Sequence, residues 1–125
     1  MFLIADDSPG KVMMLQVLLK KAKWSTPIVV ARTTEEAEEL IDAHPDISHA
    51  FIDYYIPSQY GPSIISYLKT KNPSARIALV SSADNPSNDE EAKAAGAGAC
   101  ICVTRGTSDE VEKVILELLE EWKNP

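Results

Sequence analysis

The chain has 125 residues, of which 45% are hydrophobic and 25% are charged, as is typical of a globular domain. Its 19 acidic and 12 basic side chains give a formal net charge of -7, which repels a phosphate backbone and disfavours nucleic-acid binding by this chain. The apolar run at residues 2–5 has no basic region before it, and no stretch approaches the length of a membrane span. We therefore expect a cytoplasmic protein with no membrane contact.

The N-terminal quarter predicts a strand, a helix and a second strand. Residues 2–5 (FLIA) predict a buried strand. Ser8 and Pro9 then supply a cap and a first-turn proline for a helix that ends near Ala22. Residues 27–31 (PIVVA) predict the second strand. The spacing within the helix predicts these orientations: Val12, Leu15, Leu18 and Leu19 inward, and Lys11, Lys20 and Lys21 outward.

Two further helices flank the third predicted strand, residues 49–53 (HAFID). Thr33 opens the first of these helices and is followed at the capping-box spacing by Glu36, and the helix ends near His44. The second covers residues 62–71 and is ended by the Asn-Pro pair that follows.

The C-terminal part predicts two more strands and two more helices. Residues 76–80 (RIALV) and 99–103 (ACICV) predict the fourth and fifth strands, and Gly96 ends a short alanine-rich helix between them. The final helix runs from about Ser108 to Trp122. Its predicted core face consists of Val111, Val114, Ile115, Leu118, Leu119 and Trp122.

These elements predict an α/β fold. Strands that lack polar alternation and are separated by helices indicate a parallel sheet with helices on both faces. Five such units in 125 residues predict a flavodoxin-like (βα)5 doubly wound parallel sheet with strand order 2-1-3-4-5. Because we see no linker or low-complexity segment, we expect residues 1–125 to form a single domain.

Three aspartates follow two strands that this order makes neighbours. Asp6 and Asp7 follow the first strand, and Asp53 ends the third. In such sheets ligands bind beyond the carboxyl ends of the strands, where the three side chains converge. Converging carboxylates are costly unless a cation neutralises them or their pKa values rise, and hard oxygen ligands suit Mg2+. Each aspartate taken singly could instead be a structural cap. We predict an acidic Mg2+ site that could clamp a phosphoryl group.

Four segments resemble the receiver domains of two-component response regulators. They are FLIADDSP, TTEEAEELIDAHPD, FIDYYIPSQYG and IALVSSADN, and they lie in the family's order on the predicted elements. The specific signal is the aspartate pair after the first strand combined with D-x-x-x-P-x-x-x-G after the third.

The resemblance implies roles for the acidic residues. Asp53 would be the phosphoacceptor, and Asp7 would bind Mg2+ directly while Asp6 would bind it through water. Tyr55 would contribute its backbone carbonyl to the metal. Ser81 would supply the hydroxyl that turns toward the phosphoryl group on activation.

The resemblance fails at the fifth strand. The family places there a lysine whose ammonium pairs with phosphoryl oxygens, followed by proline, but this chain reads CICVTRGTS. Depending on the alignment, the lysine position falls on Val103 or on Arg105, which keeps a positive charge but differs from lysine in geometry. The family's aromatic residue in this strand is also missing. In this chain that aromatic position falls on Cys100 or Cys102, and we expect both cysteines to be buried, reduced thiols.

Two functions remain open. The first is a stand-alone receiver domain, not an enzyme, that is phosphorylated on Asp53 with Mg2+ by a histidine kinase or phosphotransfer protein. It would signal by contact with a downstream protein target. The second is a degenerate receiver that acts as a phosphorylation-independent interaction module. A small flavodoxin-like cofactor binder is disfavoured, because the glycine-containing run at residues 96–100 precedes a strand rather than linking a strand to a helix.

Overall fold

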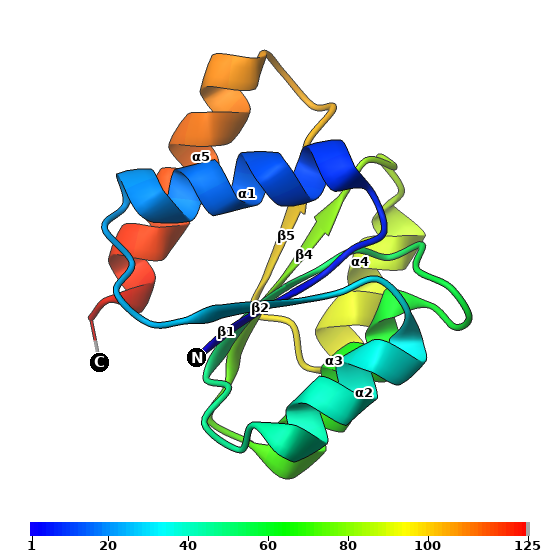
Figure 1. Cartoon of the computed structure of the whole chain (residues 1–125). Coiled ribbons are helices and arrows are strands. Elements are labelled where there is room, and N and C mark those ends of the chain that lie inside the picture. The colour runs from blue at the N-terminus through cyan, green and yellow to red at the C-terminus, as the bar shows by residue number, and fades with distance from the viewer. Residues whose placement is uncertain (125) are drawn as a thin grey trace.

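The computed structural model describes residues 1–124 and contains a sheet of five parallel strands in the order β2-β1-β3-β4-β5 (Figure 1). The strands are β1 (Phe2–Ala5), β2 (Ile28–Ala31), β3 (His49–Ile52), β4 (Arg76–Ser81) and β5 (Ala99–Cys102). The helices are α1 (Pro9–Lys21), α2 (Thr34–Ala43), α3 (Gly61–Lys71), α4 (Pro86–Ala95) and α5 (Ser108–Trp122). The predicted flavodoxin-like fold and strand order are confirmed.

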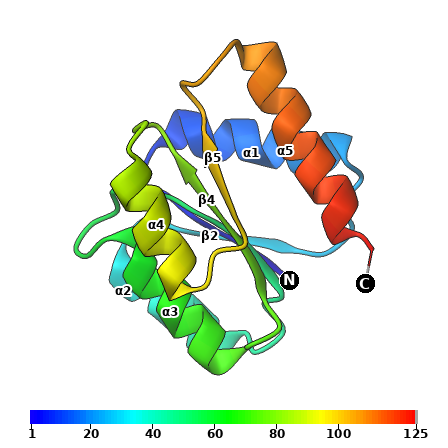
Figure 2. The ribbon, with the colours of Figure 1, turned by 180° about the vertical axis from the view of Figure 1, so that it is seen from behind.

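The helices form a layer on each face of the sheet. Helices α1 and α5 cover one face, and α2, α3 and α4 cover the other, as the two opposite views show (Figures 1 and 2). Within residues 1–124 no helix is both long enough and apolar enough to cross a bilayer.

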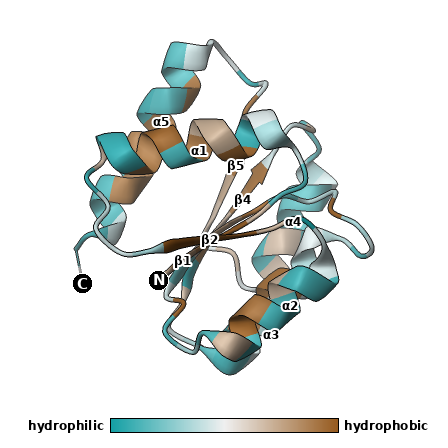
Figure 3. Ribbon diagram, in the orientation of Figure 1, coloured by the Kyte–Doolittle hydropathy of each residue, from teal (hydrophilic) through white to brown (hydrophobic). Residues whose placement is uncertain are grey.

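Each face of the sheet has its own apolar core, because successive strand side chains point to opposite faces. Phe2, Ile4 and Phe51 pack with α1 and α5, whereas Leu3 and Ile52 pack with α2, α3 and α4. The apolar colouring follows the strands and the inner sides of the helices (Figure 3). The carboxyl ends of the strands thus lie at the edge of a sheet that is packed on both faces.

Most helix ends and core faces match the sequence. Thr33 accepts the Glu36 N–H at 3.1 Å, and a complete reciprocal capping box occurs at Thr107 and Glu110. One core prediction is wrong: Val114 is 49% exposed, because it lies at the edge of the apolar stripe of α5, beyond the reach of the sheet.

Candidate functional site

Three carboxylates meet at the carboxyl edge of the sheet. Strands β1 and β3 are paired in register, with Ala5 opposite Ile52, so that Asp6, Asp7 and Asp53 follow side by side. Carboxylate oxygens of the three lie within 4.8 Å of one another. Asp6 and Asp53 are buried and Asp7 is exposed. The convergence predicted from the strand order is therefore present.

Asp53 is fixed by backbone hydrogen bonds. Its N–H donates to the Ala5 carbonyl at 2.9 Å, and its Oδ1 accepts the Tyr54 N–H at 2.9 Å. The Gly61 N–H donates to the Tyr54 carbonyl at 2.7 Å, which draws the start of α3 against the end of β3. A Cβ at Gly61 would lie 2.0 Å from the Asp53 carbonyl oxygen. The glycine of the D-x-x-x-P-x-x-x-G pattern is thus required by close backbone contact.

Thr34 anchors the loop between β3 and α3 from the neighbouring helix. It is buried, and its N–H donates to the Pro57 carbonyl at 2.5 Å. Its hydroxyl donates to the Gln59 carbonyl and accepts the Gln59 N–H, both at 3.1 Å. Sequence reasoning missed this residue, because a threonine beside a helix cap carries no signal for a loop that is distant in sequence.

Lys11 lies inside the acidic cluster. Its Nζ is 3.0 Å from Asp6 Oδ2 and 3.0 Å from Asp53 Oδ1, and it donates to the Val80 carbonyl at 3.0 Å. Its side chain is only 7% exposed. The prediction that Lys11 faces solvent is therefore wrong: its ammonium neutralises carboxylates that the adjacent strands β1 and β3 bring together.

The sequence contained a signal for this lysine. Lys11 precedes Leu15 by one helical turn and Leu18 by two, so it belongs to the buried stripe of α1. A cation in the first turn of a helix is also disfavoured by the helix dipole, and the first turn of α1 contains no acidic residue. Nearby anions explain a lysine at this position.

Asp6 is the most deeply buried member of the cluster. Its Oδ1 accepts the Ser8 N–H at 2.9 Å, whereas Oδ2 has the Lys11 ion pair but no hydrogen bond within the described part of the chain. Burial raises the pKa of Asp6, and the Ser8 N–H and the Lys11 charge oppose that rise. Hard oxygen atoms with an unsatisfied buried acceptor fit a divalent cation such as Mg2+.

Ser81 is buried at the end of β4, and its Oγ accepts the Ala83 N–H at 3.1 Å. The Val103 N–H donates to the Ser81 carbonyl at 2.9 Å, so Val103 directly continues β5 beside it. Arg105 lies on the surface, and its guanidinium pairs with Asp84, which raises the Arg105 pKa. Among the ion pairs of residues 1–124, Arg105 makes none with the acidic cluster.

Cys100 and Cys102 are free thiols on β5 and are only partly buried, so the expectation of buried thiols was too strong. Burial raises the pKa of Cys100. The outer side of this edge strand is incompletely covered by α4 and α5, which explains the exposure.

Three tyrosines form an aromatic cluster beside Asp53. Tyr54 packs against Tyr55 and Tyr60, with ring centroids at 4.8 and 5.3 Å. The Tyr54 hydroxyl donates to Glu91 Oε2 of α4 at 2.7 Å, which raises the Tyr54 pKa to about 12. The residue that follows Asp53 is thus bonded to α4, whereas β5 supplies no aromatic side chain. The Tyr55 side chain is half exposed.

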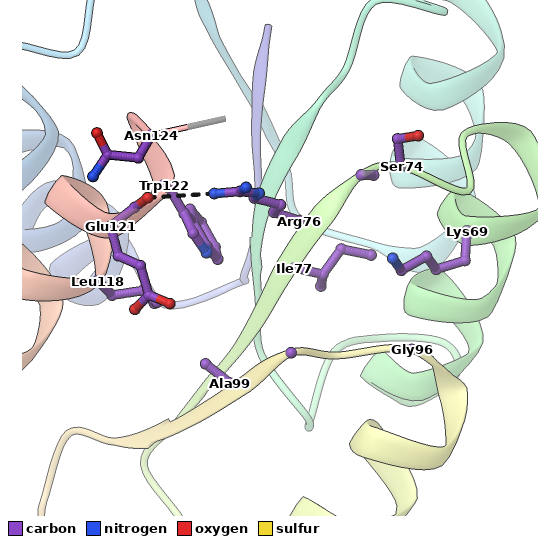
Figure 4. A pocket seen from close by; sticks show the side chains of 12 residues that line it. Lys69, Ser74, Arg76, Ile77, Gly96, Ala99, Leu118, Glu121, Trp122 and Asn124 are labelled. Carbon is purple, nitrogen blue, oxygen red and sulfur yellow. Dashed lines mark hydrogen bonds between the residues drawn. The ribbon is translucent and has the colours of Figure 1, made fainter.

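A pocket lies at the opposite edge of the sheet. It has a volume of about 540 Å³ and is lined by residues at the amino ends of β4 and β5, among them Arg76 and Ala99 (Figure 4). Arg76 donates to the Glu121 carbonyl at 3.3 Å beside it. This pocket is therefore separate from the acidic cluster.

A family model for the response regulator receiver domain matches residues 2–111. The chain belongs to this family. A search among curated proteins finds no match.

Solved receiver structures share the fold. A CheY-like receiver domain from Methanospirillum hungatei JF-1 is 20% identical, with a TM-score of 0.73, and the match covers 98% of this chain and 94% of that one. A chain of the CheX–CheY–BeF3–Mg2+ complex from Borrelia burgdorferi is 21% identical (TM-score 0.78; coverage 94% and 87%). The Mn2+-bound response regulator Rcp1 is 14% identical (TM-score 0.81; coverage 97% and 92%). At these identities the likeness concerns the fold alone.

Proposed function

We propose that this receiver domain is phosphorylated on Asp53 in a Mg2+-dependent reaction and signals by contact with a downstream protein. The observation that carries the proposal is the set of three carboxylates at one sheet edge, with Asp53 held by backbone bonds and its side chain still 10% exposed. A fixed carboxylate that solvent reaches is placed to act as a nucleophile.

The reaction is a phosphoryl transfer. A carboxylate oxygen of Asp53 forms a bond to phosphorus while the bond from phosphorus to the donor breaks, and the donor atom takes the electron pair. With a histidine kinase or phosphotransfer protein the broken bond is N–P, and the histidine leaves. Backbone bonds orient Asp53, and the Ser81 hydroxyl lies at the next strand end, where it would meet a phosphoryl oxygen.

A divalent cation would be held by Asp6, Asp7 and Asp53, with the Tyr55 backbone carbonyl as a further ligand. When bound, such an ion offsets the negative charge of the incoming phosphoryl group. The descriptions of similar structures name Mg2+ with BeF3 for the CheX–CheY complex and Mn2+ for Rcp1, and these support the proposal.

Mg2+ is expected to raise the melting temperature of the wild type, because an ion that binds the native state stabilises it by about 2.7 kcal/mol at 100 times its Kd. Asp7→Ala should respond less. Asp7 is exposed and belongs to none of the ion pairs of residues 1–124, so this change leaves the Lys11 contacts intact. Glu39→Ala, which removes an exposed carboxylate from α2, is the matched control and should respond like the wild type. Equal shifts in all three proteins would contradict the metal assignment.

Phosphorylation itself is tested by intact-mass measurement after incubation with acetyl phosphate and Mg2+. The wild type should gain one phosphoryl group, and Asp53→Asn should gain none, because an amide is a poor nucleophile. A phosphoryl gain of equal size in Asp53→Asn would place the acceptor elsewhere.

The second candidate is a phosphorylation-independent interaction module. Two observations favour it: Val103, which follows β5, is apolar, and Arg105 pairs with Asp84, so neither side chain offers a cation to Asp53. A folded wild-type protein that gains no phosphoryl group with Mg2+ would favour this second function.

A further inference from the structure

The acidic site contains a cation that comes from an unexpected element. In the receiver domains that this chain resembles, a lysine of β5 supplies the cation. In this chain Val103 is apolar and Arg105 pairs with Asp84. Lys11 instead enters from the first turn of α1 and contacts Asp6 and Asp53 at 3.0 Å each.

The ammonium of Lys11 is also placed on a defined side of Asp53. It donates to the carbonyl of Val80, the β4 residue that precedes Ser81. Strand β4 lies between β3 and β5 in the sheet. The ammonium therefore lies on the α1 side of the sheet, where it contacts Asp6 after β1, Asp53 after β3 and the Val80 carbonyl of β4.

We propose that Lys11 binds the phosphoryl group on Asp53 and so takes the role of the missing β5 lysine. This inference rests on the proposed function. A lysine ammonium has three N–H donors, and the Val80 carbonyl accepts one of them. Its contacts with Asp6 and Asp53 in the unphosphorylated protein are ion pairs.

Phosphorylation moves the negative charge at Asp53 from the carboxylate to the phosphoryl oxygens. The ammonium then exchanges its contact with Asp53 Oδ1 for a charge-assisted hydrogen bond to a phosphoryl oxygen. Lys11 keeps its proton throughout, so it forms and breaks no covalent bond. Its position on α1 also means that the phosphoryl group would be held from α1 rather than from β5.

The alternative is that Lys11 is only a counter-ion that holds the two carboxylates until a metal ion displaces it. The two roles give opposite results in Lys11→Met. If Lys11 is only a counter-ion, its removal frees the carboxylates to bind the metal, and the variant is phosphorylated as fast as the wild type or faster. If Lys11 binds the phosphoryl group, its removal slows phosphorylation even though Mg2+ binds more tightly.

The experiment measures the initial rate of phosphorylation by acetyl phosphate at saturating Mg2+, together with the Kd for Mg2+ by calorimetry. The proteins are the wild type, Lys11→Met, the exposed control Lys20→Met on the same helix, and the double variant Lys11→Met/Val103→Lys. If Lys11→Met does not fold, Lys11→Gln replaces it, because the amide still donates a hydrogen bond to the carboxylates but has no charge.

We expect the loss of Lys11 to lower the rate about tenfold or more, which corresponds to the loss of one hydrogen bond between charged groups. Lys20→Met should match the wild type, and the double variant should recover part of the rate, because Val103 continues β5 beside Ser81. A rate in Lys11→Met equal to or above that of the wild type would overturn the inference and leave the proposed function intact. A wild type that gains no phosphoryl group would overturn both.

Discussion

Gly61→Ala should unfold at a much lower denaturant concentration than the wild type, with a loss of about 3 kcal/mol in the free energy of unfolding. The new Cβ would lie 2.0 Å from the Asp53 carbonyl oxygen and 3.2 Å from Ile52 Cγ2. The nearer of these is a backbone atom, so no side-chain rotation relieves the clash. Either β3 or the start of α3 must move, and both carry the geometry of the acidic site.

Gly98→Ala is the matched control, because the nearest atom to its Cβ would be the Ile77 carbonyl oxygen at 4.0 Å, an ordinary contact. We expect a change within about 0.5 kcal/mol for this variant. The measurement is urea denaturation followed by circular dichroism. Equal midpoints for the two alanine variants would contradict the close contact between Gly61 and Asp53.

Lys11→Met should lower the free energy of unfolding by roughly 3 kcal/mol in metal-free buffer, because removing one partner leaves buried charges without compensation. Asp6 and Asp53 would lose the cation that contacts both. Mg2+ should then restore stability, and the increase in melting temperature should exceed that of the wild type, because no ammonium competes for the same carboxylates.

The control for this prediction is Lys20→Met, which makes the same chemical change at an exposed position of α1. It should alter stability by no more than about 0.5 kcal/mol. Denaturation with and without Mg2+ measures both effects. If Lys11→Met were as stable as Lys20→Met in metal-free buffer, the buried ion pairs would contribute nothing to the folded state.

The fold could be predicted from the sequence because each strand is a short apolar run and each helix begins with a cap or a proline. The convergence of Asp6, Asp7 and Asp53 followed from strand order alone, since parallel strands bring their carboxyl ends to one edge. Local pattern and general topology were sufficient for these features.

Two contacts at the site were not predicted from local sequence pattern and topology. Thr34 bonds a loop that lies more than twenty positions further along the chain, and no periodicity marks such a pair. Lys11 was assigned to the solvent because it is charged, although its helical spacing places it with Leu15 and Leu18. A long side chain can satisfy its charge at a buried site when carboxylates from other strands are within reach, and only the tertiary structure supplies them.

A tertiary contact also joins the residue that follows Asp53 to α4. The Tyr54 hydroxyl donates to Glu91 at 2.7 Å, so a hydrogen bond links the residue beside Asp53 to this helix. This contact does not involve β5, which supplies no aromatic side chain.

Borohydride reduction identifies the phosphorylated residue most directly. The wild-type protein is incubated with acetyl phosphate and Mg2+, reduced with borohydride, digested and sequenced by mass spectrometry. Reduction of an acyl phosphate on aspartate gives homoserine, so we expect homoserine at position 53 and intact aspartate at positions 6 and 7. Intact aspartate at position 53, in a protein that is folded and has bound Mg2+, would contradict the assignment of Asp53 as the phosphoacceptor.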